Sequence, residues 1–194
     1  MSNLRNSGQT LLTYGLESRK LNEWLVKWRW NLSRIFSLSL NGRKGVNGLY
    51  TPGFNNRNYE LDIYSIEPGF IFIQGTSFRF MGSYKFDSKK NLSLYGGEKS
   101  QSHSLNIESK YNILQSSSLT GKFTFNNIDY KFPPNTTVGY IMLDGLLPGS
   151  NYIWSLGFSK RLLNNIELSF QYDGRKPGSA RTVHVGRASM TALF

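Results

Sequence analysis

The sequence contains no cysteine among its 194 residues. This absence excludes disulfide frameworks, cysteine-ligated metal sites and thiol catalysis. Long hydrophobic runs are also missing: no stretch approaches the roughly 18 to 20 consecutive apolar residues of a spanning helix, so a helical membrane protein is excluded. Acidic residues are few, with 12 Asp and Glu against 23 Lys and Arg, which leaves a net charge of +11. Such a surplus is compatible with binding to nucleic acid, binding to anionic lipid, or a simply solvated surface. The distribution of the charges along the chain distinguishes these three.

Aromatic residues, in contrast, make up 14% of the chain, although hydrophobic residues as a whole reach only 39%. They recur with a period of two, which is the spacing of a strand with unlike faces. Phe78, Phe80, Tyr84 and Phe86 alternate with polar and charged residues. Joining all such runs predicts about ten strands, at residues 8–19, 23–31, 34–44, 57–73, 76–88, 99–114, 117–130, 151–161, 165–173 and 182–194. We expect a bulge or bend at Pro68, which cannot donate to a ladder.

The connections between these strands alternate in length. Tight turns are predicted at 31–34, 74–76, 114–116 and 162–164, whereas the loops at 45–56, 89–98, 131–150 and 174–181 are longer and rich in Gly, Pro, Asn and Ser. Only the first connection, near Leu21, departs from the alternation. In an up-and-down meander every second connection lies on the same rim, so one rim has short turns and the other long loops.

This combination is typical of an all-β, antiparallel, up-and-down transmembrane β-barrel of about ten strands, with apolar residues outside and polar residues inside. In such a barrel the aromatic rings meet lipid, whereas in a soluble lipocalin-like barrel they would fill one closed core. The strand count and loop asymmetry favour the membrane barrel. Six rings are candidates for its aromatic girdles: Trp24, Trp28, Trp30, Tyr111, Trp154 and Tyr172.

The polar positions of the same strands give candidate lumen residues of both signs: Arg79, Lys85, Glu108, Lys110, Lys122, Glu167 and Arg187. These could pair into an internal plug or line an anion-preferring path. The last strand places Ala188, Met190, Ala192 and the final Phe194 on one face. A terminal aromatic at this parity is characteristic of outer-membrane barrels, so we expect these four residues to be the signal for the barrel-insertion machinery.

Three C-terminal segments resemble the closing segments of large, mostly uncharacterised outer-membrane barrel proteins of Bacteroidota-type Gram-negative bacteria. They are Met142–Trp154 (MLDGLLPGSNYIW), Tyr172–Gly178 (YDGRKPG) and Val183–Arg187 (VHVGR) followed by the run to Phe194. The resemblance covers about residues 137–194. It implies that residues 1–194 are either a single barrel domain or the C-terminal part of a larger barrel, whose missing N-terminal part or other outer-membrane subunits would then be partners. It brings no catalytic residues.

Catalytic and metal chemistry finds little support. The two histidines, His103 and His184, do not form a pair at metal-ligand spacing, so no metal or other cofactor is expected. An outer-membrane hydrolase would need Asp173 with His184 across the final hairpin. Their parity places the two side chains on opposite faces, which argues against that dyad.

Four dibasic pairs lie at the predicted long-loop rim: Arg19 with Lys20, Arg43 with Lys44, Lys89 with Lys90, and Arg175 with Lys176. They form a possible binding rim for lipopolysaccharide phosphates, or a solvated loop rim. Nucleic-acid binding is not expected, because basic and aromatic residues fall on opposite faces. The sequence therefore predicts a non-enzymatic protein of the cell outer membrane, in contact with its lipid and lipopolysaccharide. Its role would be as scaffold, porin-like channel or surface-complex component; the alternatives are a soluble ligand-binding barrel and a hydrolase.

Overall fold

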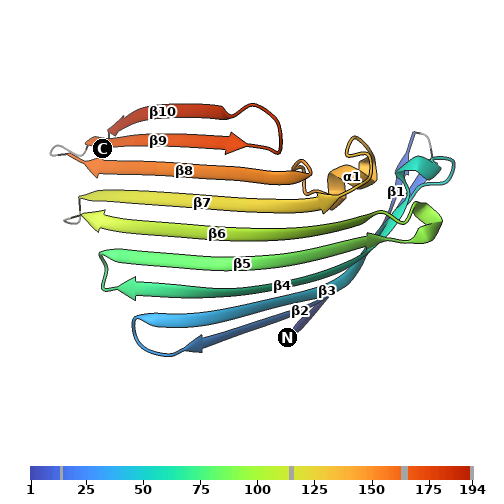
Figure 1. The fold of residues 1–194 in the computed structure, drawn as a ribbon, viewed down its shortest axis with the longest axis horizontal. Coiled ribbons are helices and arrows are strands. Elements are labelled where there is room, and N and C mark those ends of the chain that lie inside the picture. Colours follow the sequence, from blue (N-terminus) through green and yellow to red (C-terminus); the bar gives the residue numbers. More distant parts are fainter. Residues whose placement is uncertain (14, 114–115, 163–165, 193–194) are drawn as a thin grey trace.

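The computed structural model describes residues 1–13, 15–113, 116–162 and 166–192. Ten strands and one short helix dominate it (Figure 1). The strands are β1 (Ser2–Leu12), β2 (Gly15–Asn31), β3 (Phe36–Tyr50), β4 (Tyr59–Gln74), β5 (Phe78–Asn91), β6 (Lys99–Ile113), β7 (Ser117–Tyr130), β8 (Gly149–Arg161), β9 (Ile166–Lys176) and β10 (Val183–Ala192). The helix α1 (Thr137–Met142) and the 3-10 turns η1 (Asn55–Arg57) and η2 (Ser93–Tyr95) lie in the connections.

All ten strands form one antiparallel sheet in sequence order, which confirms the predicted up-and-down architecture. β1 and β10 are its two edges, and in the part of the chain that the structure describes no pairing joins them. The first and last strands therefore lie at opposite sides of the sheet (Figure 1). The registers stay constant along every ladder, so each side chain keeps its face from one end of its strand to the other.

The two ends of the sheet differ as predicted. At one end, on the left of Figure 1, the connections are short, as at residues 32–35 and 75–77. At the other end lie the longer connections 51–58, 92–98, 131–148 and 177–182, which include α1 and both 3-10 turns. We call these the short-turn end and the long-loop end.

The first strand lies earlier than predicted. It runs from Ser2 to Leu12 rather than over 8–19, and β2 already begins at Gly15. The predicted strand 8–19 overlaps β1 only at 8–12. β1 pairs with β2 between Gly15 and Leu25, mostly beyond the aromatic rings of that strand. Most of its side chains are polar, and Leu4, Leu11 and Leu12 do not recur with a period of two.

The predicted bulge at Pro68 is absent. Pairing of β4 with β5 pauses at Glu67 and Pro68 and resumes at Gly69 with no residue inserted. Pro68 lacks an N–H, so omitting one pair of ladder contacts is sufficient to accommodate it.

The registers divide the strand residues between two faces. The polar face carries Arg43, Lys89, Glu108, Lys122 and Asp173. The strand residues directly before and after each of these lie on the aromatic face. Twelve basic and seven acidic strand residues share the polar face. So many charges make that face unfit to contact hydrocarbon.

The only cluster of buried apolar residues in the described chain lies at the long-loop end, beneath α1. Val138, Met142 and Leu143 pack there with Leu61 and Ile63 of β4 and with neighbouring strand residues. Thr136 caps the helix by accepting a hydrogen bond from the Gly139 N–H at 2.9 Å. The loop that follows β7 therefore folds back over the polar face rather than extending away from the sheet.

Candidate functional site

All seven predicted lumen residues lie on the polar face. The ladder sets Arg79 opposite Lys110, and Glu108 opposite Lys122. Glu108 and Lys122 form an ion pair with an N–O distance of 3.2 Å. Lys85 lies 3.8 Å from Asp87, and Arg187 lies 3.4 Å from Asp173. Four of the seven, Lys85, Glu108, Lys122 and Arg187, are thus in ion pairs within the sheet.

Hydroxyl and amide side chains connect the strands across the middle of the polar face. Ser83 donates to the Glu67 carboxylate at 2.9 Å, and Thr124 donates to the Asn106 carbonyl at 3.0 Å. Asn106 also lies 3.5 Å from the Ser83 hydroxyl, which completes a belt from β4 to β7. A hollow of about 320 Å³ opens above this belt. Its lining combines apolar side chains, among them Ile71 and Met81, with the polar belt, and its charged residues are Glu67 and the Glu108–Lys122 pair.

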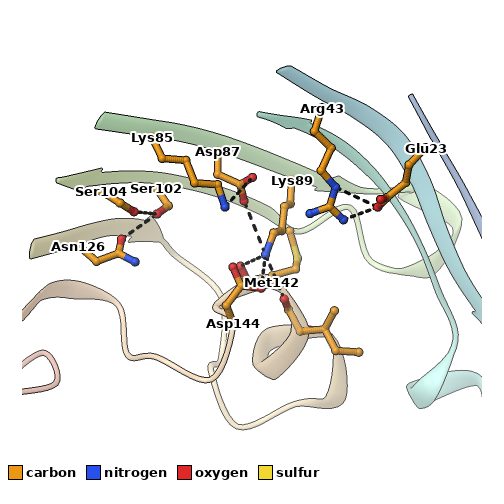
Figure 2. A network of polar contacts seen from close by, with 11 residues as sticks. Glu23, Arg43, Lys85, Asp87, Lys89, Ser102, Ser104, Asn126, Met142 and Asp144 are labelled. Atoms are coloured by element: carbon orange, nitrogen blue, oxygen red, sulfur yellow. Dashed lines mark hydrogen bonds and ion pairs between the residues drawn. The ribbon is translucent and has the colours of Figure 1, made fainter. Parts of the chain in front are cut away.

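Among the basic residues that the structure describes on the polar face, Lys89 is the most buried, with a side chain that is only 6% exposed. Figure 2 shows it directed into the loop that carries α1. Its ammonium donates to the backbone carbonyls of Ile141 and Met142, each at 3.3 Å, and lies 2.6 Å from the Asp144 carboxylate. Asp87 lies 3.6 Å away on the same strand. A cation is favoured at the last carbonyls of a helix, so Lys89 fastens the end of α1 to β5.

Asp144 adopts a positive φ of 52°, which non-glycine residues seldom do, and Gly145 continues the turn with a φ of 75°. This turn brings the Asp144 carboxylate back onto Lys89. Asn151, which is 1% exposed, donates to the Leu147 carbonyl at 2.8 Å and accepts from the Gly178 N–H at 3.1 Å. The segment 142–154, which the sequence singled out, thus closes α1 and fixes two loops.

The four dibasic pairs are split by the alternation of their strands. Arg19, Arg43, Lys89 and Arg175 lie on the polar face, while Lys20, Lys44, Lys90 and Lys176 lie on the aromatic face. Arg43 forms an ion pair with the buried Glu23, as Figure 2 shows, and Arg19 donates to Glu17 at 2.8 Å. Only one residue of each pair therefore lies on the aromatic face, and the lipopolysaccharide rim stays a prediction.

The aromatic face has a continuous apolar band. It comprises the aromatic-face residues of Trp24–Trp30, Phe36–Gly42, Tyr64–Phe72, Phe78–Phe86, His103–Tyr111, Leu119–Phe125, Tyr152–Phe158, Ile166–Gly174 and His184–Ala192. None of these residues is Asp, Glu, Lys or Arg. On β4 the band covers nine residues, Tyr64–Phe72, within the about 9–11 residues with which a strand crosses a bilayer.

The side chains of the band are uncovered. Trp28 is 55% exposed, Phe170 is 51% exposed and Phe123 is 38% exposed. Phe78, Phe80 and Phe125 are not buried either. The rings are therefore not sealed in a core, whereas the soluble-barrel alternative requires a closed core of these rings.

Charged residues return on the aromatic face outside the band: Lys160 lies opposite Leu168 toward the short-turn end, and a larger set lies at the long-loop end. We call this set the collar: Arg5, Lys20, Lys44, Glu60, Asp62, Lys90, Lys99, Asp129 and Lys176. The predicted girdle residues Trp24, Trp154 and Tyr172 lie at or next to the collar edge of the band, whereas Trp30 and Tyr111 lie at the short-turn edge.

The three C-terminal segments meet on the aromatic face next to the collar. The indole of Trp154 lies over Gly174, where an added β-carbon would clash with the ring unless the indole moved. His184 stacks on Tyr172 with ring centres 5.9 Å apart, and the two side chains share a hydrogen bond of 2.7 Å. Residues from the three segments thus form one aromatic cluster on this face.

His184 and Asp173 lie on opposite faces, as parity predicted, because His184 pairs with Gly174 and Asp173 with Val185. Within the described ranges no three His, Cys, Asp or Glu residues are grouped as metal ligands. Nor does any helix in those ranges have the length and apolarity to cross a membrane. Ala188, Met190 and Ala192 share the aromatic face of β10, while Phe194, the last residue of the expected insertion signal, lies outside the described residues.

Two tyrosines support the core under α1. Burial raises the pKa of Tyr59, and burial likewise raises the pKa of Tyr130. Both lie at the long-loop end, and both phenols are therefore neutral at ordinary pH.

No protein-family model matches the sequence, and no curated protein matches it. Among solved structures, the chain is similar to the NanC porin, with a TM-score of 0.47 and 11% identity over 98% of this chain and 92% of that one. It is also similar to the outer membrane channel DcaP of Acinetobacter baumannii, with a TM-score of 0.46 and 8% identity. That match covers 90% of this chain and 61% of the DcaP chain.

Proposed function

We propose that this chain forms the wall of an integral outer-membrane β-barrel and has a non-enzymatic role as scaffold, channel or surface-complex component. The observation that carries the proposal is the band of exposed rings, which contains no Asp, Glu, Lys or Arg, opposite a face that carries twelve basic and seven acidic strand residues. In water such a band would be a large exposed apolar surface, whereas in a bilayer it meets acyl chains. The Bacteroidota-type resemblance of residues 137–194 supports the outer membrane as the location.

Partition tests this proposal directly. The purified chain is expected to need detergent or lipid to stay dispersed, and to remain with membranes after extraction at alkaline pH. Monodisperse behaviour in water without detergent would contradict the proposal and favour a soluble ligand-binding barrel.

The edges of the sheet indicate further partners. β2 pairs with β1 only as far as Leu25, so within the described chain its edge at 26–31 has no neighbour on that side, although it lies at the level of the band. Hydrocarbon does not satisfy free N–H and C=O groups, so this edge and that of β10 need strands beside them in a membrane. We propose that these strands belong to another part of the same barrel or to another outer-membrane subunit.

A photo-crosslinker at Lys27 tests this partnership, since Lys27 lies on the free part of the β2 edge. In native membranes it should give one discrete adduct, whereas the same crosslinker at Lys122, in the middle of the sheet, should give none. Equal labelling at both positions would argue against a specific strand partner.

Whether the polar face lines a conducting path depends on the α1 loop, which covers the long-loop end. Ion pairing of Lys122 with Glu108 and of Arg187 with Asp173 favours a filled lumen over an open pore. Single-channel recording in planar bilayers separates the two. A filled lumen predicts no conductance steps, and an anion path predicts steps whose ion preference changes in an Arg79→Glu variant.

A further inference from the structure

In each of the dibasic pairs Arg43–Lys44 and Lys89–Lys90, the two side chains lie on opposite faces of the sheet. Arg43 and Lys89 are engaged on the polar face, with Glu23 and with Asp144. Lys44 and Lys90 are exposed on the aromatic face, and among the described residues neither has an ion-pair partner. The alternation of β3 and β5 thus leaves two free ammonium groups at the collar edge of the apolar band.

These two lysines line one hollow of about 670 Å³ on the aromatic face, together with Trp24, Asp62, Tyr64 and Ser88. The ladder places Lys44 directly between Trp24 and Tyr64. Lys90 lies opposite Asp62 on the neighbouring strand, and Ser88 lies opposite Tyr64. Two cations against one carboxylate leave the hollow positive, with a hydroxyl donor beside them.

The hollow lies where the apolar band meets the collar. Trp24 and Tyr64 are the last rings of the band on β2 and β4, and they are 45% and 49% exposed. Tryptophan and tyrosine favour the headgroup level of a bilayer, and lysines there reach toward lipid phosphates. The residues of the hollow therefore combine the two requirements of a lipid site, rings for the acyl boundary and ammonium groups for the headgroup.

We propose that this hollow binds the phosphate of an anionic lipid headgroup in preference to a zwitterionic one, with Lys44 and Lys90 donating charge-assisted hydrogen bonds to the phosphate oxygens. The inference rests on the proposed function, because it requires the band to be in the bilayer. A free phosphate ion would satisfy the lysines but not Trp24 and Tyr64. For that reason we assign the site to a lipid rather than to a dissolved anion.

Fluorescence of Trp24 reports on the site directly. In a variant that retains only this tryptophan (Trp28→Phe, Trp30→Phe, Trp154→Phe), the protein is reconstituted into phosphatidylcholine vesicles doped with brominated phosphatidate or brominated phosphatidylcholine. Brominated phosphatidate should quench Trp24 at a mole fraction lower by about fivefold or more, since a lysine near the membrane surface has that effect on anionic lipid binding. Lys44→Gln with Lys90→Gln should bring the two lipids to equal quenching.

Lys20→Gln with Lys176→Gln is the matched control, because it removes the same charge from the same collar outside the hollow. This control should keep the preference for phosphatidate. Loss of preference in the control, or its survival in the Lys44 and Lys90 variant, overturns the site. Suppression by millimolar inorganic phosphate, but not by chloride of equal ionic strength, would show a free-anion site and would also overturn it.

The same experiment separates the two proposals. Equal quenching by both lipids in the unmodified hollow contradicts the lipid site alone, because the protein is then in the bilayer. Absence of quenching by either lipid contradicts the membrane location itself.

Discussion

The two ends of the sheet differ in what covers them. At the long-loop end, α1 buries Leu61, Ile63 and Ile128 against the polar face, so the chain supplies its own apolar core there. Toward the short-turn end, no described segment covers either face, and Trp28 and Trp30 stack on each other in the open. The comparison teaches that this fold depends on its own packing at one end and, in our proposal, on the bilayer at the other.

The largest effect is expected for a cavity beneath α1. Leu61 is fully buried, and Leu61→Ala should lower the free energy of unfolding by about 3 kcal/mol, because the rigid surroundings cannot fill the space. Leu105, 41% exposed on the aromatic face, is the matched control. Leu105→Ala should cost less, because fluid acyl chains fill the gap. Urea unfolding in phosphatidylcholine vesicles measures both, and equal losses would remove the distinction between the two ends.

A charge placed in the band tests the two faces against each other. Ile107→Arg puts a guanidinium in the middle of the band and should cost about 2–4 kcal/mol in a bilayer. Met81→Arg places the same group one strand away on the polar face, beside Glu108, and should change stability by less than about 1 kcal/mol. If Ile107→Arg is tolerated as well as Met81→Arg, the aromatic face does not meet lipid.

Neighbouring lysines on opposite faces sharpen the comparison at the long-loop end. Lys89→Met removes the ammonium that bonds two carbonyls and Asp144 at the end of α1, and should cost about 2 kcal/mol. Lys90→Met changes the next residue in the same way, but should stay within about 0.5 kcal/mol because its head is free. Amide exchange over 137–145 should rise only in Lys89→Met. Faster exchange in both variants would show that Lys89 does not fasten the helix.

The smallest effect is expected for the ion pair in the middle of the polar face. Lys122 and Glu108 are 60% and 40% exposed, so water screens their attraction. Glu108→Gln should therefore change the free energy of unfolding by about 0.5 kcal/mol or less. A loss of several kcal/mol in the same unfolding assay would mean that this pair is sequestered from water in the assembled barrel.

Much of the fold follows from the alternation alone. The predicted strands 99–114 and 117–130 are observed at Lys99–Ile113 and Ser117–Tyr130. Their apolar and polar residues alternate with a period of two, and this alternation marks where each strand begins and ends. The same parity correctly separated Asp173 from His184. β1 was misplaced because most of its side chains are polar and its leucines do not alternate, so no period marks its ends.

The site was harder to predict than the strands. The contact of Lys89 with Asp144 joins residues 55 positions apart, and it depends on how the loop after β7 folds back over the sheet. No local pattern encodes that path. The short helix did leave a trace, since Thr136 precedes Val138, Ile141 and Met142 at helical spacing, but six residues in a proline-flanked loop give too weak a signal. Likewise, the two residues of each dibasic pair were predicted to act together because they are adjacent in sequence, whereas the strand places them on opposite faces.

Depth-dependent quenching of the tryptophans in the band tests the central claim most directly. Variants that retain only Trp28 or only Trp30 are reconstituted into vesicles of phosphatidylcholine brominated at defined acyl positions. If the aromatic face lies against hydrocarbon, the bromines should quench these tryptophans strongly and aqueous iodide should quench them little. Protection of both rings from brominated lipid, together with ready quenching by iodide, would contradict a face that lies against hydrocarbon.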